Sequence, residues 1–262
     1  MLPFLSRQAT STPGAAPPDA GSVPRPNAAA PQSTSTTPLA SLTAAREGPG
    51  EPAAFADGLK SLLAQVLTLW GVSEDLSAQT LATWPAAADG TPDVPAIVAR
   101  YQLSATQLPA TTLEELRAMD LPAILELGDR RLYLLRRLDG PTAIVIAPGG
   151  GQTRVGVEDL DKSWSHSAWV MWRNVDLLPV DPHQNLTPIV IATLALRLQR
   201  LGLLSPPMPT SNTERFQEAV RRFQASMGLV PDGIVGPRTT LALSRAVAGR
   251  FGPSLAGSPL SR

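Results

Sequence analysis

The sequence predicts an α+β protein in which helices and antiparallel strands form one domain and three helices form a second. Three observations indicate this organisation. Apolar residues recur at helical spacing after residue 54, short apolar runs between Gly-containing turns follow from Leu121, and three helical patterns occupy the C-terminal part. The first 54 residues, rich in Pro, Ala, Ser and Thr, predict a disordered tether, because they offer too little apolar surface to offset the entropy of ordering.

Composition excludes several classes of function. The 22 basic and 22 acidic residues cancel, so no global field favours nucleic acid as a partner. The chain contains no cysteine, which rules out a thiol nucleophile, and with only His166 and His183 we expect no metal site and no cofactor. No apolar run is long enough to span a membrane, and the short N-terminal apolar stretch does not make a signal peptide.

Four helices are expected in the first half of a domain at residues 55–178. Helical spacing from Phe55 to Trp70, ended by Gly71, predicts the first. The others are expected from about residue 73 or 75 to 83, from 94 to 100, and from 112 to 119 with Thr111 or Thr112 as cap. Helices therefore precede the strands in this domain.

Five strands are expected after the helices. Alternating or continuous apolar runs lie at residues 123–127, 131–135, 142–146, 154–157 and 168–172, separated by Gly-Asp, Asp-Gly and Gly-Gly turns. We interpret the tryptophans in helices and strands as core residues, namely Trp70, Trp164, Trp169 and Trp172. Gly149-Gly150-Gly151 is expected to be a hairpin loop, since a phosphate-binding loop would need a following helix and lysine.

Three short helices are expected at residues 187–250, after a linker at 179–186. Thr187 and Pro188 suit the start of the first, whose apolar residues are expected on one face: Ile189, Ala192, Leu196 and Leu201. A possible capping box, Ser211 with Glu214, starts the second, which continues with Phe216, Val220, Phe223 and Met227. Gly236-Pro237 starts the third, with Leu243, Ala246 and Val247 facing inward. Residues 251–262 are expected to be a disordered tail.

A sequence motif lies between the second and third of these helices and includes the end of the second. Arg221-Arg222-Phe223-Gln224 before the helix end, and Asp232-Gly233-Ile234-Val235-Gly236 after it, resemble the peptidoglycan-binding-domain family. The resemblance implies a shallow groove that takes the stem peptide or glycan of peptidoglycan. Its exposed polar candidates are Gln224, Asp232, Arg238 and Thr239, of which Arg238 could pair with a stem-peptide carboxylate through two hydrogen bonds. Alternatively, these residues only build the fold, with Asp232 closing a turn and the glycines supplying positive φ.

The middle domain carries a second resemblance. Residues 111–125, the Asp139-Gly140 turn, and residues 157–160 before a Trp-rich strand resemble the double-glycine peptidase family, which is papain-like. In this sequence, Tyr133 stands near the position of the family's catalytic histidine, and Ala147 stands at the position of its catalytic aspartate. The sequence has no cysteine that could serve as the nucleophile. A phenol is mostly protonated at neutral pH and is a poor nucleophile toward amides. We therefore expect an inactive domain that binds a partner in the former substrate groove, near Tyr133, Trp70 and Trp84.

Neither histidine predicts catalysis. His166 lies between Ser165 and Ser167, but neighbouring residues in a loop usually point apart, so this arrangement does not indicate a hydrolase. His183 follows Asp181-Pro182 in the linker and is expected to be solvated.

An inactive peptidase-like domain followed by a peptidoglycan-binding domain resembles the periplasmic region of the general secretion pathway protein A family, over residues 55–248. The resemblance implies a non-catalytic role in type II secretion, gripping peptidoglycan so that the outer-membrane secretin can be inserted and assembled. It also implies a periplasmic location, with inner-membrane association through a partner or an upstream segment. Because no phosphate-binding Gly-Lys-Ser/Thr loop is present, energy coupling would come from a partner ATPase. The alternatives are a cell-wall hydrolase or peptidase targeted by the binding domain, and a remnant without a present role.

Overall fold

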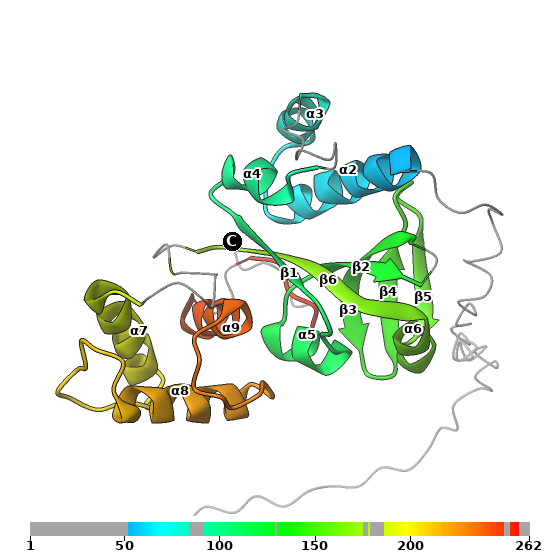
Figure 1. Cartoon of the computed structure of the whole chain (residues 1–262). Helices are drawn as coiled ribbons and strands as arrows, with labels where there is room; N and C mark the ends of the chain where they lie inside the picture. Colours follow the sequence, from blue (N-terminus) through cyan, green and yellow to red (C-terminus); the bar gives the residue numbers. More distant parts are fainter. Residues whose placement is uncertain are drawn as a thin grey trace, which may run out of the picture. The chain divides into compact units, whose positions relative to one another are not determined.

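The structure, a computed structural model, describes residues 52–83, 92–128, 130–174, 178, 186–248 and 252–256. The expected tether, Trp84, His183 and most of the expected linker lie outside these residues, and statements of absence below refer to the described residues alone. Figure 1 shows the arrangement of the elements.

A six-stranded sheet organises the first domain. Its strands are β1 (Ser104–Leu108), β2 (Ala123–Leu127), β3 (Leu132–Asp139), β4 (Thr142–Ile146), β5 (Gln152–Gly156) and β6 (Trp164–Trp172). They lie in the order β1-β6-β2-β3-β4-β5, and every neighbouring pair is antiparallel. The predicted class, α+β with an antiparallel sheet, is confirmed. Strand β1 was not expected, because Ser-Ala-Thr-Gln-Leu lacks a clear alternation of apolar residues.

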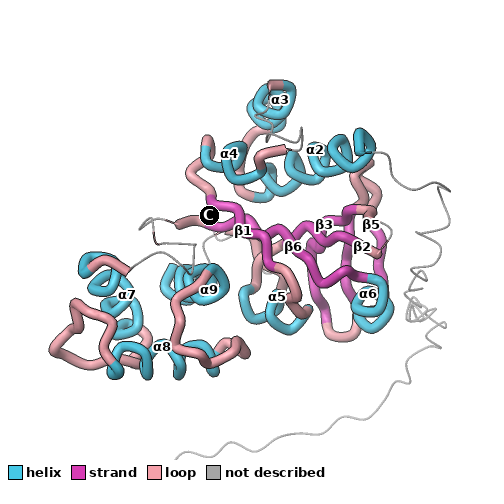
Figure 2. The backbone as a smooth tube through the Cα atoms, in the orientation of Figure 1, coloured by secondary structure: helices cyan, strands magenta, loops and turns pink. Residues whose placement is uncertain are grey.

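Helices cover both faces of the sheet. On one face lie α2 (Pro52–Leu69) and α4 (Val94–Ala99), with α3 (Glu74–Ala82) packed on α2 further from the strands, and on the other lie α5 (Leu113–Met119) and α6 (Val157–Ser163) (Figure 2). The alternation of side chains along β3 separates two cores: Leu132 and Leu134 belong to the cluster beneath α2, and Tyr133 and Leu135 to the cluster beneath α5 and α6. The start of α6 was expected to be strand.

Helix α5 is fixed at both ends by its own sequence. Thr112 and Glu115 form a capping box at the N-terminus. At the C-terminus Asp120 adopts a left-handed conformation with φ of 52°, which non-glycine residues other than Asn and Asp seldom adopt. The expected helix at 112–119 is therefore present.

The C-terminal module consists of α7 (Pro188–Arg200), α8 (Glu214–Ser226) and α9 (Pro237–Ala248). Its core contains Phe216 and Phe223 of α8, as the spacing predicted. The N-cap of α8 is Thr213, which accepts a hydrogen bond from the Phe216 N–H, and the expected capping box at Ser211 is wrong. In α9, Leu243 is buried as predicted, but Ala246 is exposed and Leu241 and Ala242 take the inward positions.

The inward face of α7 also differs from the prediction. Ile189, expected on the apolar face, is 79% exposed, and Leu196 is exposed as well. The buried residues are instead Ile191, Leu194, Ala195, Arg197 and Leu198. Because apolar residues occupy nearly every position from 188 to 196, the sequence does not fix which side of this helix faces the core.

A short segment at residues 252–256, here named the C-terminal strap, packs on the first domain. Leu255 is fully buried, and its carbonyl accepts a hydrogen bond of 3.0 Å from the Leu138 N–H of β3. Gly252 has φ of 101°, and a Cβ at this position would lie 2.5 Å from the Trp70 ring. The expectation of a disordered tail from residue 251 is therefore wrong for the strap.

Candidate functional site

The partner-binding groove expected near Tyr133 and Trp70 does not take the predicted form. Tyr133 is buried in the cluster beneath α5 and α6, on the face of the sheet opposite α2. Trp70 packs against both clusters and against Gly252. Because Tyr133 is buried in the core, it is not placed to line a groove, and the prediction of a groove at Tyr133 and Trp70 is wrong for this residue.

The segment expected at the peptidase aspartate position does lie against α2. Ser61 of α2 donates a hydrogen bond to the Pro148 carbonyl, and Gln65 Nε2 lies 3.4 Å from the Ala147 carbonyl. These contacts are between neutral groups and fix the loop between β4 and β5 to the helix. The Ser61 hydroxyl faces a backbone carbonyl, so these contacts bring no basic side chain to it that could activate it as a nucleophile.

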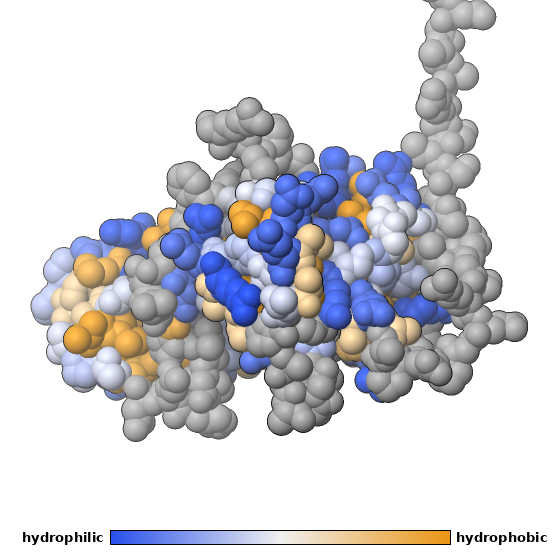
Figure 3. Space-filling model, turned by 90° about the horizontal axis from the view of Figure 1, so that it is seen from above, coloured by the Kyte–Doolittle hydropathy of each residue, from blue (hydrophilic) through white to orange (hydrophobic). Residues whose placement is uncertain are grey.

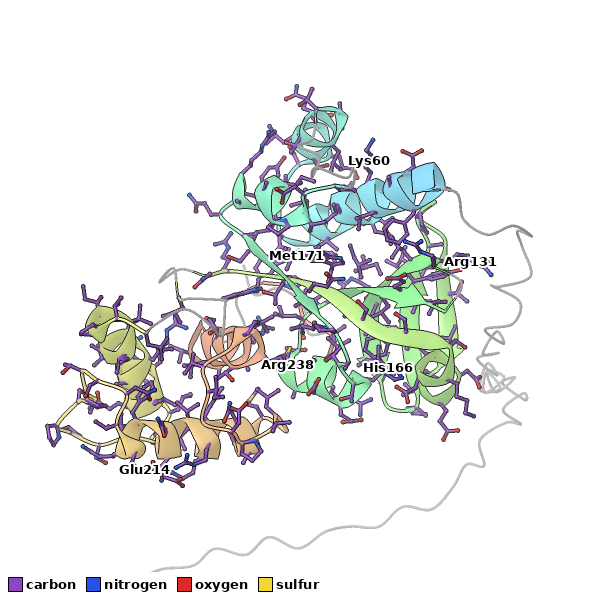
Figure 4. All side chains as sticks on the ribbon, in the orientation of Figure 1. Lys60, Arg131, His166, Met171, Glu214 and Arg238 are labelled. Carbon is purple, nitrogen blue, oxygen red and sulfur yellow. The ribbon has the colours of Figure 1, made fainter. Side chains whose placement is uncertain are left out.

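His166 lies away from α2, on the side of the sheet where α5 packs (Figure 4). Its Nδ1 is 3.2 Å from the Thr111 carbonyl, and its ring centroid is 5.1 Å from that of Trp164. The Trp164 Nε1–H donates to the Ser167 carbonyl, so the Trp164 ring also holds this part of β6. No group of three potential metal ligands occurs in the part of the chain that the structure describes.

Gln224 organises the loop between α8 and α9. It is 2% exposed, and its Nε2 lies 2.8 Å from Asp232 Oδ1, 3.0 Å from the Ile234 carbonyl and 3.1 Å from Thr239 Oγ1. Its Oε1 accepts from the Gly233 N–H at 2.8 Å. One buried amide thus holds the turn at residues 232–234 and the first turn of α9 against α8, which makes this part of the loop rigid.

Asp232 and Thr239 belong to the same network. Asp232 Oδ1 also accepts from the Ile234 N–H at 2.8 Å, closing the turn, while Thr239 is buried. Gly233 has φ of 77°, and an added Cβ would lie 3.3 Å from the Gln217 carbonyl. The prediction that Gln224 and Thr239 are exposed is therefore wrong, whereas Asp232 is exposed as expected. Contact of any of them with peptidoglycan stays a prediction.

Arg238 lies at the start of α9 and reaches α5 of the first domain. Its Nη2 donates to the Pro109 carbonyl, and its Nε lies 3.7 Å from Glu115 Oε2. The Nε atom is buried and has no hydrogen-bond partner among the described residues. The guanidinium that sequence reasoning assigned to a ligand carboxylate is thus placed beside a carboxylate of the same chain.

Two apolar residues of the same loop were missed by sequence reasoning. Val230 is 75% exposed and Ile234 is 56% exposed. They flank the turn at Asp232-Gly233, and their alternation with buried Leu229, Gly233 and Val235 is the signal that could have identified them. Figure 3, a view of another face, shows further apolar surface toward the end of the molecule where the C-terminal module lies in Figure 1.

A second contact joins α9 to α5. Arg245 Nη2 lies 2.9 Å from Asp120 Oδ2, and Asp120 Oδ1 accepts from Ser254 Oγ at 2.7 Å and from the Ala256 N–H at 3.0 Å. Burial alone would raise the pKa of Asp120, but hydrogen bonds from Ser254, Ala256 and Arg245, with the charge of Arg245, lower it below its ordinary value. This carboxylate therefore binds both α9 and the C-terminal strap.

The chain thus consists of an α+β domain and a C-terminal three-helix module. Residues 191–243 match the family model described as "Putative peptidoglycan binding domain", which confirms the sequence resemblance for this module. No curated protein matches the sequence significantly.

Similar solved structures include a periplasmic domain of the EpsAB fusion protein of the Vibrio vulnificus type II secretion system, with 19% identity, coverage of 74% of this chain and 82% of that chain, and a TM-score of 0.36. The N-terminal peptidase C39 like domain of the toxin secretion ATP-binding protein from Vibrio parahaemolyticus is 20% identical, over 50% of this chain and 100% of that one, with a TM-score of 0.35. A double glycine motif protease from an AMS/PCAT transporter is 17% identical, over 43% of this chain and 79% of that one, with a TM-score of 0.33.

Proposed function

We propose that this chain is a non-catalytic peptidoglycan-binding factor of type II secretion, which anchors to the cell wall and assists the insertion and assembly of the secretin. The observation that carries the proposal is the match of residues 191–243 to a peptidoglycan-binding family, on three helices whose buried residues belong to one hydrophobic cluster that continues into the α+β domain. The role in secretion rests on the sequence resemblance of residues 55–248. It includes a secretin and an inner-membrane ATPase as further partners.

The proposed binding surface is the rigid loop between α8 and α9. Val230 and Ile234 offer exposed aliphatic side chains, Asp232 offers a carboxylate, and Arg238 offers a guanidinium. Stem peptides of peptidoglycan carry methyl groups and free carboxylates, which suit aliphatic contacts and bidentate pairing with arginine. Gln224 and Thr239 would act indirectly, by holding the loop in shape.

The non-catalytic assignment is argued from chemistry. The sequence has no cysteine for the peptidase reaction, and Tyr133, which stands near the expected histidine position, lies in the core. His166 contacts a backbone carbonyl and a tryptophan ring. These observations support binding without hydrolysis.

The proposed location is the periplasm, where peptidoglycan is accessible. Among the residues that the structure describes, no helix combines the length and the apolar character needed to cross a bilayer. The proposal for location therefore depends on the binding module and on the family resemblance.

Sedimentation of the full chain with purified insoluble peptidoglycan tests the binding function. We expect the chain to sediment, and Ile234→Asp to weaken binding because it places a charge on the proposed surface. Ile189→Asp is the matched control, since Ile189 is at least as exposed but lies on α7. A chain that stays in the supernatant at every salt concentration would refute the proposal. Release of soluble muropeptides by the intact chain would instead support a hydrolase.

The role in secretion needs a separate test in the source cell. Deleting the gene should reduce the amount of multimeric secretin in the outer membrane and reduce secretion. Unchanged secretin multimers would contradict the assembly role while leaving peptidoglycan binding intact.

A further inference from the structure

The guanidinium of Arg238 is already engaged inside the molecule. It donates to the carbonyl of Pro109 through Nη2, and its Nε faces Glu115 of α5. Figure 4 shows Arg238 on the side of α9 that faces α5. A ligand carboxylate that pairs with the Nε edge of this guanidinium would therefore have to take the place of Glu115.

Glu115 is held in position for this contact. Its Oε2 accepts from the Thr112 N–H at 3.2 Å and from the Thr111 hydroxyl, because Glu115 belongs to the capping box of α5. Its side chain is only 16% exposed. The same oxygen faces Arg238, so the carboxylate is fixed without relying on the arginine.

The contact between the two side chains is incomplete. A distance of 3.7 Å from Nε to Oε2 is too long for a hydrogen bond, and the buried Nε–H of Arg238 is left without an acceptor among the described residues. An unsatisfied buried donor costs free energy. A ligand carboxylate that approached to hydrogen-bond distance would satisfy this donor, whereas Glu115 does not.

A stronger contact on the same face of α9 remains when Arg238 is released. Arg245, two turns further along α9, binds Asp120 at 2.9 Å and also the Asp120 backbone carbonyl at 3.1 Å. Both arginines face α5, but only Arg245 makes direct hydrogen bonds to its carboxylate. The module can thus exchange partners at Arg238 without leaving the first domain.

We propose that Glu115 is an internal competitor for the peptidoglycan-binding module, occupying Arg238 until a carboxylate of the wall displaces it. The inference rests on the proposed function and adds a role for the α+β domain, which lowers the affinity of the module. Because coupling between two sites is reciprocal, a bound wall fragment also frees the carboxylate of Glu115.

Sedimentation with purified insoluble peptidoglycan, using the full chain, tests the proposal through Glu115→Gln. Glutamine keeps the acceptor that the capping box needs and removes the charge that faces Arg238. We expect binding to tighten roughly threefold to fivefold, the range of a partly exposed ion pair, and the gain to shrink at high salt. The matched control is Glu114→Gln on the same turn of α5, where Glu114 pairs with Arg117, and it should bind like the wild type.

Repeating the comparison in chains that lack the Arg238 guanidinium shows whether the gain in binding depends on Arg238. In chains that carry Arg238→Gln, the Glu115→Gln substitution should give no gain, because the competing pair is already absent. If the wild type binds and Glu115→Gln binds equally or more weakly, the internal competitor is refuted and the binding function stands. If the gain persists without Arg238, the competitor is also refuted. If no variant sediments, the proposed function and this inference both fail.

Discussion

Replacing Asp120 by Asn tests the carboxylate that joins α5, α9 and the C-terminal strap. Asparagine tolerates the left-handed backbone at this position and keeps one oxygen for the Ser254 hydroxyl and the Ala256 N–H. What it removes is the charge facing Arg245, together with one charge-assisted hydrogen bond at 2.9 Å. The substitution therefore isolates the ionic part of the contact.

The expected loss follows from the geometry. A hydrogen bond to a charged group contributes roughly 1.5–3 kcal/mol. The Asp120 side chain is 26% exposed, and Arg245 would still donate to two backbone carbonyls after the substitution. We therefore expect a loss of about 1–2 kcal/mol in the free energy of unfolding. For a domain of this size that corresponds to a decrease of about 2–8 °C in Tm.

The stability difference between wild type and Asp120→Asn should depend on pH in a definite direction. The folded-state pKa of Asp120 is lowered, so its contribution is present above the pKa of the unfolded chain, near 4, and is lost as pH falls through the folded-state pKa. The difference between wild type and Asp120→Asn should therefore be constant near neutrality and shrink in acid. Urea unfolding at several pH values measures it.

Asp139→Asn is the matched control. Asp139 precedes the turn glycine Gly140, and its exposed carboxylate forms an ion pair with Arg137 at 3.5 Å, so its replacement should change stability little. Equal stability of Asp120→Asn and wild type at neutral pH, or a difference that grows in acid, would refute the reasoning.

Three further substitutions test the loop and the strap. Gln224→Ala should lower the free energy of unfolding by about 2–3 kcal/mol, because it leaves buried partners unsatisfied, while Gln217→Ala on the same helix should cost far less; chemical denaturation compares them. Gly252→Ala should destabilise by more than about 1 kcal/mol, since its Cβ would overlap Trp70, and a quenched or shifted tryptophan emission should accompany the loss. Leu255→Ala should cost about 2–5 kcal/mol in thermal unfolding, and no change would show that the strap does not pack.

Elements with a strong periodic pattern could be predicted from the sequence. Phe216, Val220 and Phe223 recur on one face of α8, and the structure buries all three. The phase of α7 could not be predicted, because its apolar run is nearly continuous. Strand β1 forms through pairing with β6, a long-range contact that the polar sequence from Ser104 does not indicate.

The site was less predictable than the fold. The motif around Asp232 and Thr239 identified the correct loop, but a polar side chain in a motif can serve a ligand or the backbone. Only the structure shows that the buried Gln224 amide bonds to the Gly233 N–H and the Ile234 carbonyl of the turn. The pairing of Arg238 with Glu115 joins residues far apart in sequence, so no local pattern indicates it.

Burial of Leu255 changes how the binding module is connected to the rest of the chain. Trp172 before the module and Leu255 after it both belong to the core of the first domain, so the module is inserted into that domain's chain path instead of hanging from one end. When such an insertion is pulled by a bound ligand, tension divides between the covalent chain before the module and the non-covalent packing of the strap after it. A protease cut or a bulky fusion that dislodged the final attachment would leave a single connection to carry the whole force.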